Sequence, residues 1–147
     1  MNNNIPNLLD VNFLVALAWP NHIAHTRAVA WFLENTDTPF ATCPITEAGF
    51  IRISMNPLIV TEHTTLKTVL GMLGLYQSRY KHVFWPDDLG VADAFSLFTT
   101  ISGHRQITDA YLVSLAASHG GRLVTFDSGV TAITPPDLAG NLLLVAL

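Results

Sequence analysis

The stretch Asn7-Leu8-Leu9-Asp10, followed by the apolar segment 13–19, decides the fold class. Its first four residues are typical of a short buried strand that ends on an acid. The segment after it has the character of a buried helix and stops at Pro20. The same order of strand and helix returns along the chain. Strands that alternate with helices predict an α/β protein with a mostly parallel sheet covered on both faces.

Turn and capping residues divide the rest of the chain into similar units. Pro44 suits the first position of a helix, Asn21 suits a helix cap, and Gly120-Gly121 suits a helix end. Further strands are expected at 39–43, 82–85, 122–126 and 142–146, and further helices at 21–34, 44–54, from 64 or 65 onward, at 90–100 and at 107–119.

Composition limits the class of protein. The chain has 147 residues, of which 50% are hydrophobic and 12% are charged, and this predicts one folded domain over 1–147 and excludes a disordered chain. Mean hydropathy is high at +0.37. The longest apolar run, 13–19, is far shorter than the roughly 18 residues of a membrane span, so no membrane association is expected. The lone Cys43 suits a reducing cytoplasm.

The surplus of apolar residues predicts a surface that a partner covers. Trp19, Trp31, Phe32 and the stripe within 66–73 exceed what one small core needs. We therefore expect a homodimer and, in addition, a groove that accepts a partner segment.

Four acids are placed to meet at one edge of the sheet. Asp10 and Asp127 end predicted strands, while Glu47 lies in the first turn of the helix after the second strand. Asp109, with Thr108 as the expected cap, begins a helix that leads back into the fourth strand. The carboxyl ends of parallel strands, and the helix starts next to them, share one rim where functional crevices form.

These acids differ from ordinary caps and turn formers because they converge. Glu47 and Asp109 each head the apolar stripe of a helix, where an unpaired carboxylate is costly. Each acid alone is commonly explained by the helix dipole or by a turn. Four acids on four elements with few basic neighbours instead predict a hard divalent cation, Mg²⁺ or Mn²⁺.

The motifs around these acids resemble those of a known family. Leu8-Leu9-Asp10-Val11-Asn12, Ile45-Thr46-Glu47-Ala48, Thr108-Asp109-Ala110 and Thr125-Phe126-Asp127 are similar, in order and spacing, to the motifs of PIN-domain ribonucleases, and most of all to VapC toxins of toxin–antitoxin pairs. The stretches 85–88 and 103–106 look like one VapC branch. The resemblance covers about 6–129 and implies a three-layer α/β/α sandwich, a magnesium-dependent endoribonuclease acting on single-stranded or loop RNA, dimerisation, and inhibition by a VapB-type antitoxin.

The resemblance also assigns roles to individual residues. It implies that the four acids are catalytic and bind the metal, with direct ligation by Glu47, ligation through water, and orientation of the attacking water all left open. Asn12 and Thr125 would support the acids, and Arg105 is a candidate phosphate contact. The antitoxin is expected to insert an arginine among the acids. The four family acids map onto Asp10, Glu47, Asp109 and Asp127.

Two other functions compete with this hypothesis. An aspartate-based phosphoryl-transfer domain, haloacid-dehalogenase-like or receiver-like, would use Asp10 as nucleophile, but Asn12 stands where such phosphatases place a second aspartate. A non-catalytic PIN-like domain would bind RNA or protein without cutting it.

The net charge of −4 argues weakly against RNA binding through a broad basic face. The 11 acidic residues less these four leave 7, which equals the number of Lys and Arg. The whole imbalance therefore lies in the predicted metal site, so RNA binding is expected to be local and metal-dependent.

Overall fold

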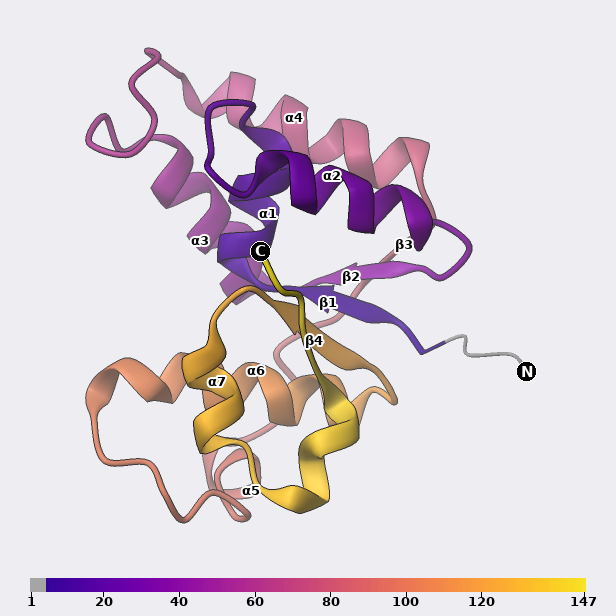
Figure 1. The fold of residues 1–147 in the computed structure, drawn as a ribbon, viewed down its shortest axis with the longest axis vertical. Helices are drawn as coiled ribbons and strands as arrows, with labels where there is room; N and C mark the ends of the chain where they lie inside the picture. Colours follow the sequence, from indigo (N-terminus) through magenta and orange to yellow (C-terminus); the bar gives the residue numbers. More distant parts are fainter. Residues whose placement is uncertain (1–4) are drawn as a thin grey trace.

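A parallel sheet forms the centre of the computed structural model, which describes residues 5–147 (Figure 1). The strand order is β3-β2-β1-β4-β5, and every neighbouring pair is parallel. The strands are β1 (Asn7–Leu9), β2 (Phe40–Thr42), β3 (His82–Phe84), β4 (Arg122–Thr125) and β5 (Leu142–Leu144). The predicted α/β class is confirmed, and the sheet is parallel throughout these pairs.

Helices cover both faces of this sheet and give three layers. One side carries α1 (Val11–Ala18), α2 (His25–Glu34), α3 (Pro44–Ser54) and α4 (Leu66–Arg79). The other side carries α5 (Val91–Ala94), α6 (Ile107–Ser118) and α7 (Ser128–Ile133), with short 3₁₀ turns η1 (His104–Gln106) and η2 (Pro136–Asn141) (Figure 1).

Two hydrophobic clusters fill the space between the layers, one on each face. Successive residues of a strand point to opposite faces. Leu9 and Val124 accordingly pack with α1–α4, while Leu8 and Leu123 pack with α6. The three central strands β1, β2 and β4 are thus buried on both faces, which agrees with their mostly apolar sequences.

Three helix boundaries differ from the sequence prediction. Asn21 does not cap a helix: His22 forms a turn whose Nδ1 accepts from the Ala24 amide, and α2 begins only at His25. The predicted helix at 90–100 is confined to α5, and a long loop follows it. The stretch after Asp127, where no helix was predicted, contains α7, which Asp127 caps. Of these helices, α7 has a side-chain cap, whereas α2 and α5 begin without one.

Only some of the apolar residues that were expected at a partner surface are exposed. Trp19, Trp31 and Phe32 belong to the core, with 8%, 8% and 4% of their surfaces exposed, so they are not available to a partner. Trp19 also donates its indole hydrogen to Ser54 Oγ at 2.9 Å, which satisfies its polar atom. On α4, by contrast, Leu66 and Leu70 stay 50% and 48% exposed.

The end of α6 follows its predicted design. Gly120 has φ of 69°, a left-handed conformation that glycine adopts without steric cost. The next amide, that of Gly121, bonds back to the Ala116 carbonyl at 2.8 Å and closes the helix. The chain can therefore turn directly into β4.

Among residues 5–147, no helix has both the length and the apolar character that a bilayer crossing requires.

The close approach of α1 and α3 gives a prediction for stability. A Cβ on Gly49 would lie 2.6 Å from Val11 Cγ2, and β-branched Val11 has little freedom to move aside. We expect Gly49→Ala to lower the free energy of unfolding by about 1–3 kcal/mol. Urea unfolding followed by circular dichroism measures this change.

Gly71→Ala is the matched control on α4, because nothing lies within 4 Å of a Cβ there. It should stabilise the protein by about 0.5–1 kcal/mol through helix propensity. Equal effects of the two substitutions would contradict the packing assigned to Gly49.

Candidate functional site

Asp10 is a buried carboxylate at the carboxyl end of β1. Only 6% of its surface is exposed. Its Oδ1 accepts from the Val11 amide at 2.8 Å, which caps α1, and its Oδ2 accepts from Thr125 Oγ1 at 2.8 Å. Burial raises the pKa of Asp10, the Thr125 and Val11 hydrogen bonds oppose that rise, and the Asp127 charge adds to it. The fold therefore holds this acid in one place.

Thr125 connects Asp10 with the end of β4. Its hydroxyl donates to Asp10 and accepts from the Asp127 amide at 3.1 Å and from Asn12 Nδ2 at 3.2 Å. Asn12 also accepts from the Phe126 amide at 3.4 Å. The structure thus places both residues predicted to support the acids between Asp10 and the segment that bears Asp127.

Asp109 and Asp127 approach Asp10 from the other helical layer. Asp127 caps α7, where its Oδ1 accepts from the Gly129 amide at 2.8 Å. Asp109 lies in the first turn of α6, and burial, together with the Asp10 and Asp127 charges, raises its pKa to about 6. Asp10 and Asp127 therefore lie close enough for their charges to act on Asp109. Thr108 lies inside α6 and does not cap it, since Gln106 occupies the cap position.

Glu47 occupies the same edge of the sheet but has its own partners. Its amide bonds to the Cys43 carbonyl in the first turn of α3. Its Oε2 accepts from Thr42 Oγ1 at 2.7 Å and from Gln77 Nε2 at 3.0 Å. The four acids predicted to gather therefore differ in their surroundings. The three aspartates act on one another through their charges, whereas Glu47 is held at the same edge of the sheet by hydrogen bonds from Thr42 and Gln77.

Thr42, Gln77 and His82 were not anticipated from the sequence. His82 Nε2 lies 2.7 Å from Thr42 Oγ1 and completes a polar group around Glu47. A polar Thr42 within an otherwise apolar strand was the available signal. Gln77 and His82 carry no local signal, because only the packing of α4 and β3 brings them here.

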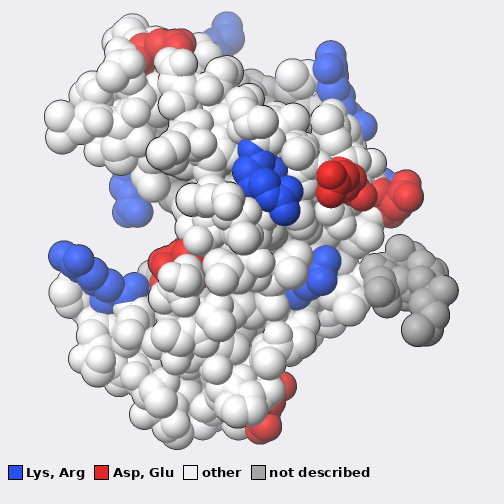
Figure 2. Space-filling view, viewed as in Figure 1, with Lys and Arg blue, Asp and Glu red and all other residues white. Residues whose placement is uncertain are grey.

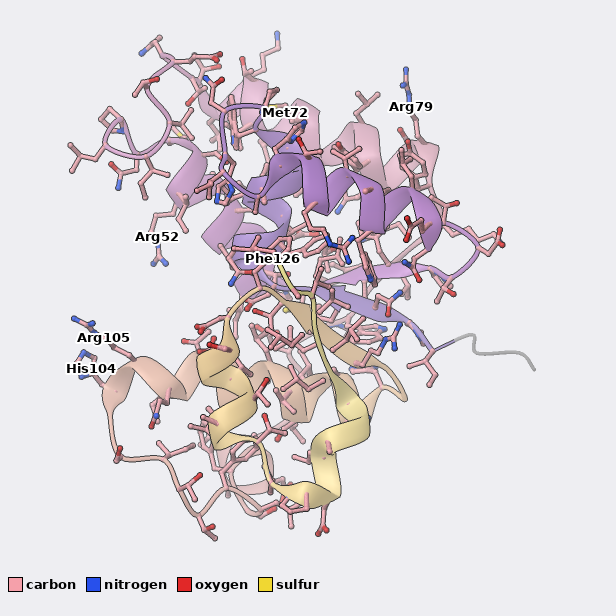
Figure 3. The ribbon with its side chains drawn as sticks, in the orientation of Figure 1. Arg52, Met72, Arg79, His104, Arg105 and Phe126 are labelled. Atoms are coloured by element: carbon pink, nitrogen blue, oxygen red, sulfur yellow. The ribbon has the colours of Figure 1, made fainter. Side chains whose placement is uncertain are left out.

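Two arginines flank the acidic region on opposite sides. Arg52 projects from α3 and Arg105 from η1, both exposed (Figure 3). In the space-filling view the surface is indented between the two helical layers, and acidic atoms lie between basic side chains there (Figure 2). Neither arginine forms an ion pair with the residues that the structure describes. Arg79 points away on the far side of α4 (Figure 3).

The carboxylate oxygens at this site suit a hard cation, although they do not surround a single position. Asp10, Asp109 and Asp127 offer carboxylate oxygens, the ligands that Mg²⁺ prefers. Between residues 5 and 147 no group of three or more His, Cys, Asp and Glu side chains stands in metal-binding geometry.

Comparisons with known proteins agree on one family. The family model described as PIN domain matches residues 8–134. Ribonuclease VapC39 from Mycobacterium tuberculosis (strain ATCC 25618 / H37Rv) is 44% identical over 124 residues, which span 84% of this chain and 89% of that protein. Ribonuclease VapC38 of the same strain is 46% identical over 123 residues, or 84% of this chain and 86% of that protein.

A solved structure shares the fold. A chain in the crystal structure of VapBC2 from Rickettsia felis, bound to a DNA fragment from their promoter, matches with a TM-score of 0.62 and 15% identity over 97% of this chain and 99% of that one. At this identity the match supports the three-layer α/β/α architecture. The matching family model and the two relatives establish that the chain belongs to the PIN-domain family, in the branch of the VapC proteins.

Proposed function

We propose that this protein is a VapC-type toxin, a magnesium-dependent endoribonuclease that adds water across phosphodiester bonds of RNA. The observation that carries the proposal is the group of three aspartates, which three elements bring to one edge of the sheet, where burial and the neighbouring acids raise the pKa values of Asp10 and Asp109. Such a group needs a cation, and relatives named as ribonucleases cover most of the chain. Membership in the PIN-domain family disfavours the phosphoryl-transfer alternative.

The side chains of the site divide the work. Asp10, Asp109 and Asp127 would hold Mg²⁺, with Mn²⁺ as a possible substitute. The bound ion would act as a Lewis acid toward the phosphate and lower the pKa of a water. Thr125 and Asn12 keep Asp10 and the Asp127 segment together through their hydrogen bonds. Glu47 would bind the metal or orient the attacking water.

The charge distribution supports RNA as a substrate bound at the acids. Arg52 and Arg105 stand on the two sides of the indentation and have no acidic partner within residues 5–147. A phosphate chain laid across the acids would pass both guanidinium groups, which bind phosphate well. Single-stranded or loop RNA is the proposed form.

Partners and location follow the family. We propose a VapB-type antitoxin as a partner, because a solved structure with the same fold is that of VapBC2 from Rickettsia felis. We further propose that this antitoxin inserts an arginine among the acids. The exposed Leu66 and Leu70 of α4 support a homodimer. The cytoplasm, which keeps the buried Cys43 thiol reduced, is the proposed compartment.

Replacing Asp10 tests the nuclease. Asp10→Asn keeps the size of the side chain but removes a charge from the proposed metal ligand, so we expect RNA cleavage to fall at least about 100-fold. Total RNA and short labelled RNAs are incubated with Mg²⁺ or with EDTA. The exposed Asp137→Asn in η2 should cleave like the unmodified protein. If Asp10→Asn and the unmodified protein leave identical RNA in every condition, the domain binds without cutting.

Replacing Asp109 tests the electrostatics of the metal-free site. Its folded pKa of about 6 exceeds the ordinary aspartate value of 3.8, so the folded state binds this proton more tightly and stability falls as pH rises between these values. In EDTA at pH 7.5, Asp109→Asn should gain about 1 kcal/mol after solvent screening, or about 2–4 °C in Tm.

Scanning fluorimetry at two pH values checks this sign. The gain should shrink at pH 4.5, where Asp109 is protonated in the folded protein, and added Mg²⁺ should raise Tm more in the unmodified protein. An equal gain at both pH values would show that charge repulsion is not the cause.

Replacing the two arginines tests the path of the RNA. Arg52→Ala and Arg105→Ala should each raise KM several-fold and reduce the slope of log affinity against log salt by about 0.7, the value for one lost phosphate contact on a single strand. Arg79→Ala, an exposed arginine on the opposite side, is the matched control. A salt slope that is the same in all three variants would argue against this path.

A further inference from the structure

A second polar group lies beside the aspartates, between α3, α4 and the β2–β3 edge. Thr42 ends β2, His82 begins β3, Glu47 lies on α3 and Gln77 on α4. Thr42 Oγ1 is 2.7 Å from both Glu47 Oε2 and His82 Nε2, and Gln77 Nε2 is 3.0 Å from Glu47 Oε2. Residues of β2 and α4 thus donate directly to one carboxylate oxygen of Glu47, and His82 of β3 reaches it through Thr42.

The direction of these bonds follows from counting protons. A carboxylate only accepts, so the single hydroxyl hydrogen of Thr42 must go to Glu47. Thr42 can then only accept from His82, and His82 must carry its hydrogen on Nε2. Burial lowers the pKa of His82, although the nearby Glu47 opposes this effect. The ring is therefore neutral near pH 7.5, and its single N–H hydrogen can lie on either Nδ1 or Nε2. The chain of donors runs from His82 through Thr42 to Glu47.

The group holds Glu47 without neutralising it. All three donors are uncharged near neutral pH, and among residues 5–147 no ion pair is formed by Glu47. Both hydrogen bonds end on Oε2, and within the described residues no bond engages Oε1. The carboxylate is therefore fixed through one oxygen, while the other is left for water or metal. The His82 ring is itself held against Phe40, with ring centroids 4.8 Å apart.

We propose that His82, Thr42 and Gln77 are positioning residues, which orient Glu47 for the reaction of the neighbouring aspartate site. This inference rests on the proposed nuclease function. A purely structural role would require only that the polar atoms be satisfied. A positioning role requires, in addition, the Nε2–H tautomer and an effect on rate that passes through Glu47.

The tautomer is measured without any catalysis. Long-range ¹H–¹⁵N NMR of the folded protein at pH 7.5 in EDTA should show His82 as the Nε2–H form. Thr42→Val, nearly the same shape without a hydroxyl, should shift the His82 ring signals, whereas Thr42→Ser should preserve them. An Nδ1–H tautomer would overturn the relay.

The kinetic test uses two replacements of His82. The Gln amide can place its nitrogen near the Nε2 position, whereas the shorter Asn amide cannot. We expect His82→Asn to lower kcat about tenfold with KM within twofold, and His82→Gln to recover most of the rate. His63→Asn, at an exposed loop position, is the control for losing a histidine. Thermal unfolding checks that each variant is folded.

A double-mutant cycle decides whether the effect passes through Glu47. In the Glu47→Gln background, His82→Asn should cost little further activity, because the group that it orients is already altered. A tenfold loss that persists in this background, or equal losses for Asn and Gln at position 82, would overturn the proposal. If the unmodified protein cleaves no RNA, the nuclease proposal fails, and the tautomer still decides whether the relay exists.

Discussion

The burial of the Asp10 carboxylate at the end of β1 is the constraint on which the site depends. A buried charge is costly unless hydrogen bonds or a counter-charge support it. Asp10 receives bonds from the Val11 amide and the Thr125 hydroxyl, but its nearest charged neighbours, Asp109 and Asp127, are also acids. The fold therefore places several negative charges close together at the carboxyl end of β1. Functional sites commonly tolerate such a local cost within a stable scaffold.

The aspartates and Glu47 at this edge of the sheet have different electrostatic surroundings. The aspartates repel one another, and the pKa values of Asp10 and Asp109 are raised, so a divalent cation would gain affinity there from charge alone. Glu47 instead receives neutral donors from Thr42 and Gln77, which fix its position without cancelling its charge. One group is thus prepared to bind an ion, and its neighbour is prepared to act beside that ion.

The sequence predicted those features that local patterns encode. Acids that follow apolar strands, Pro44 at a helix start and Gly120 at a helix end each have a local cause, and the structure places them as expected. The predicted cap at Thr108 was wrong because η1 continues directly into α6 and moves the cap to Gln106. The tryptophans were assigned to a partner surface because composition cannot show how deep a small three-layer core is.

The partners of Glu47 were beyond local reasoning for a related reason. Gln77 and His82 are 30 and 35 positions away in sequence. Only the packing of α4 and the pairing of β2 with β3 bring Gln77 to Glu47 Oε2 and His82 to Thr42 Oγ1. The register Phe40↔His82 places the histidine ring beside Phe40, two residue pairs before Thr42. Sheet register therefore determines whether the relay can form. Any change that shifts β3 against β2 by one residue would turn His82 to the opposite face and leave Glu47 with Thr42 and Gln77 alone.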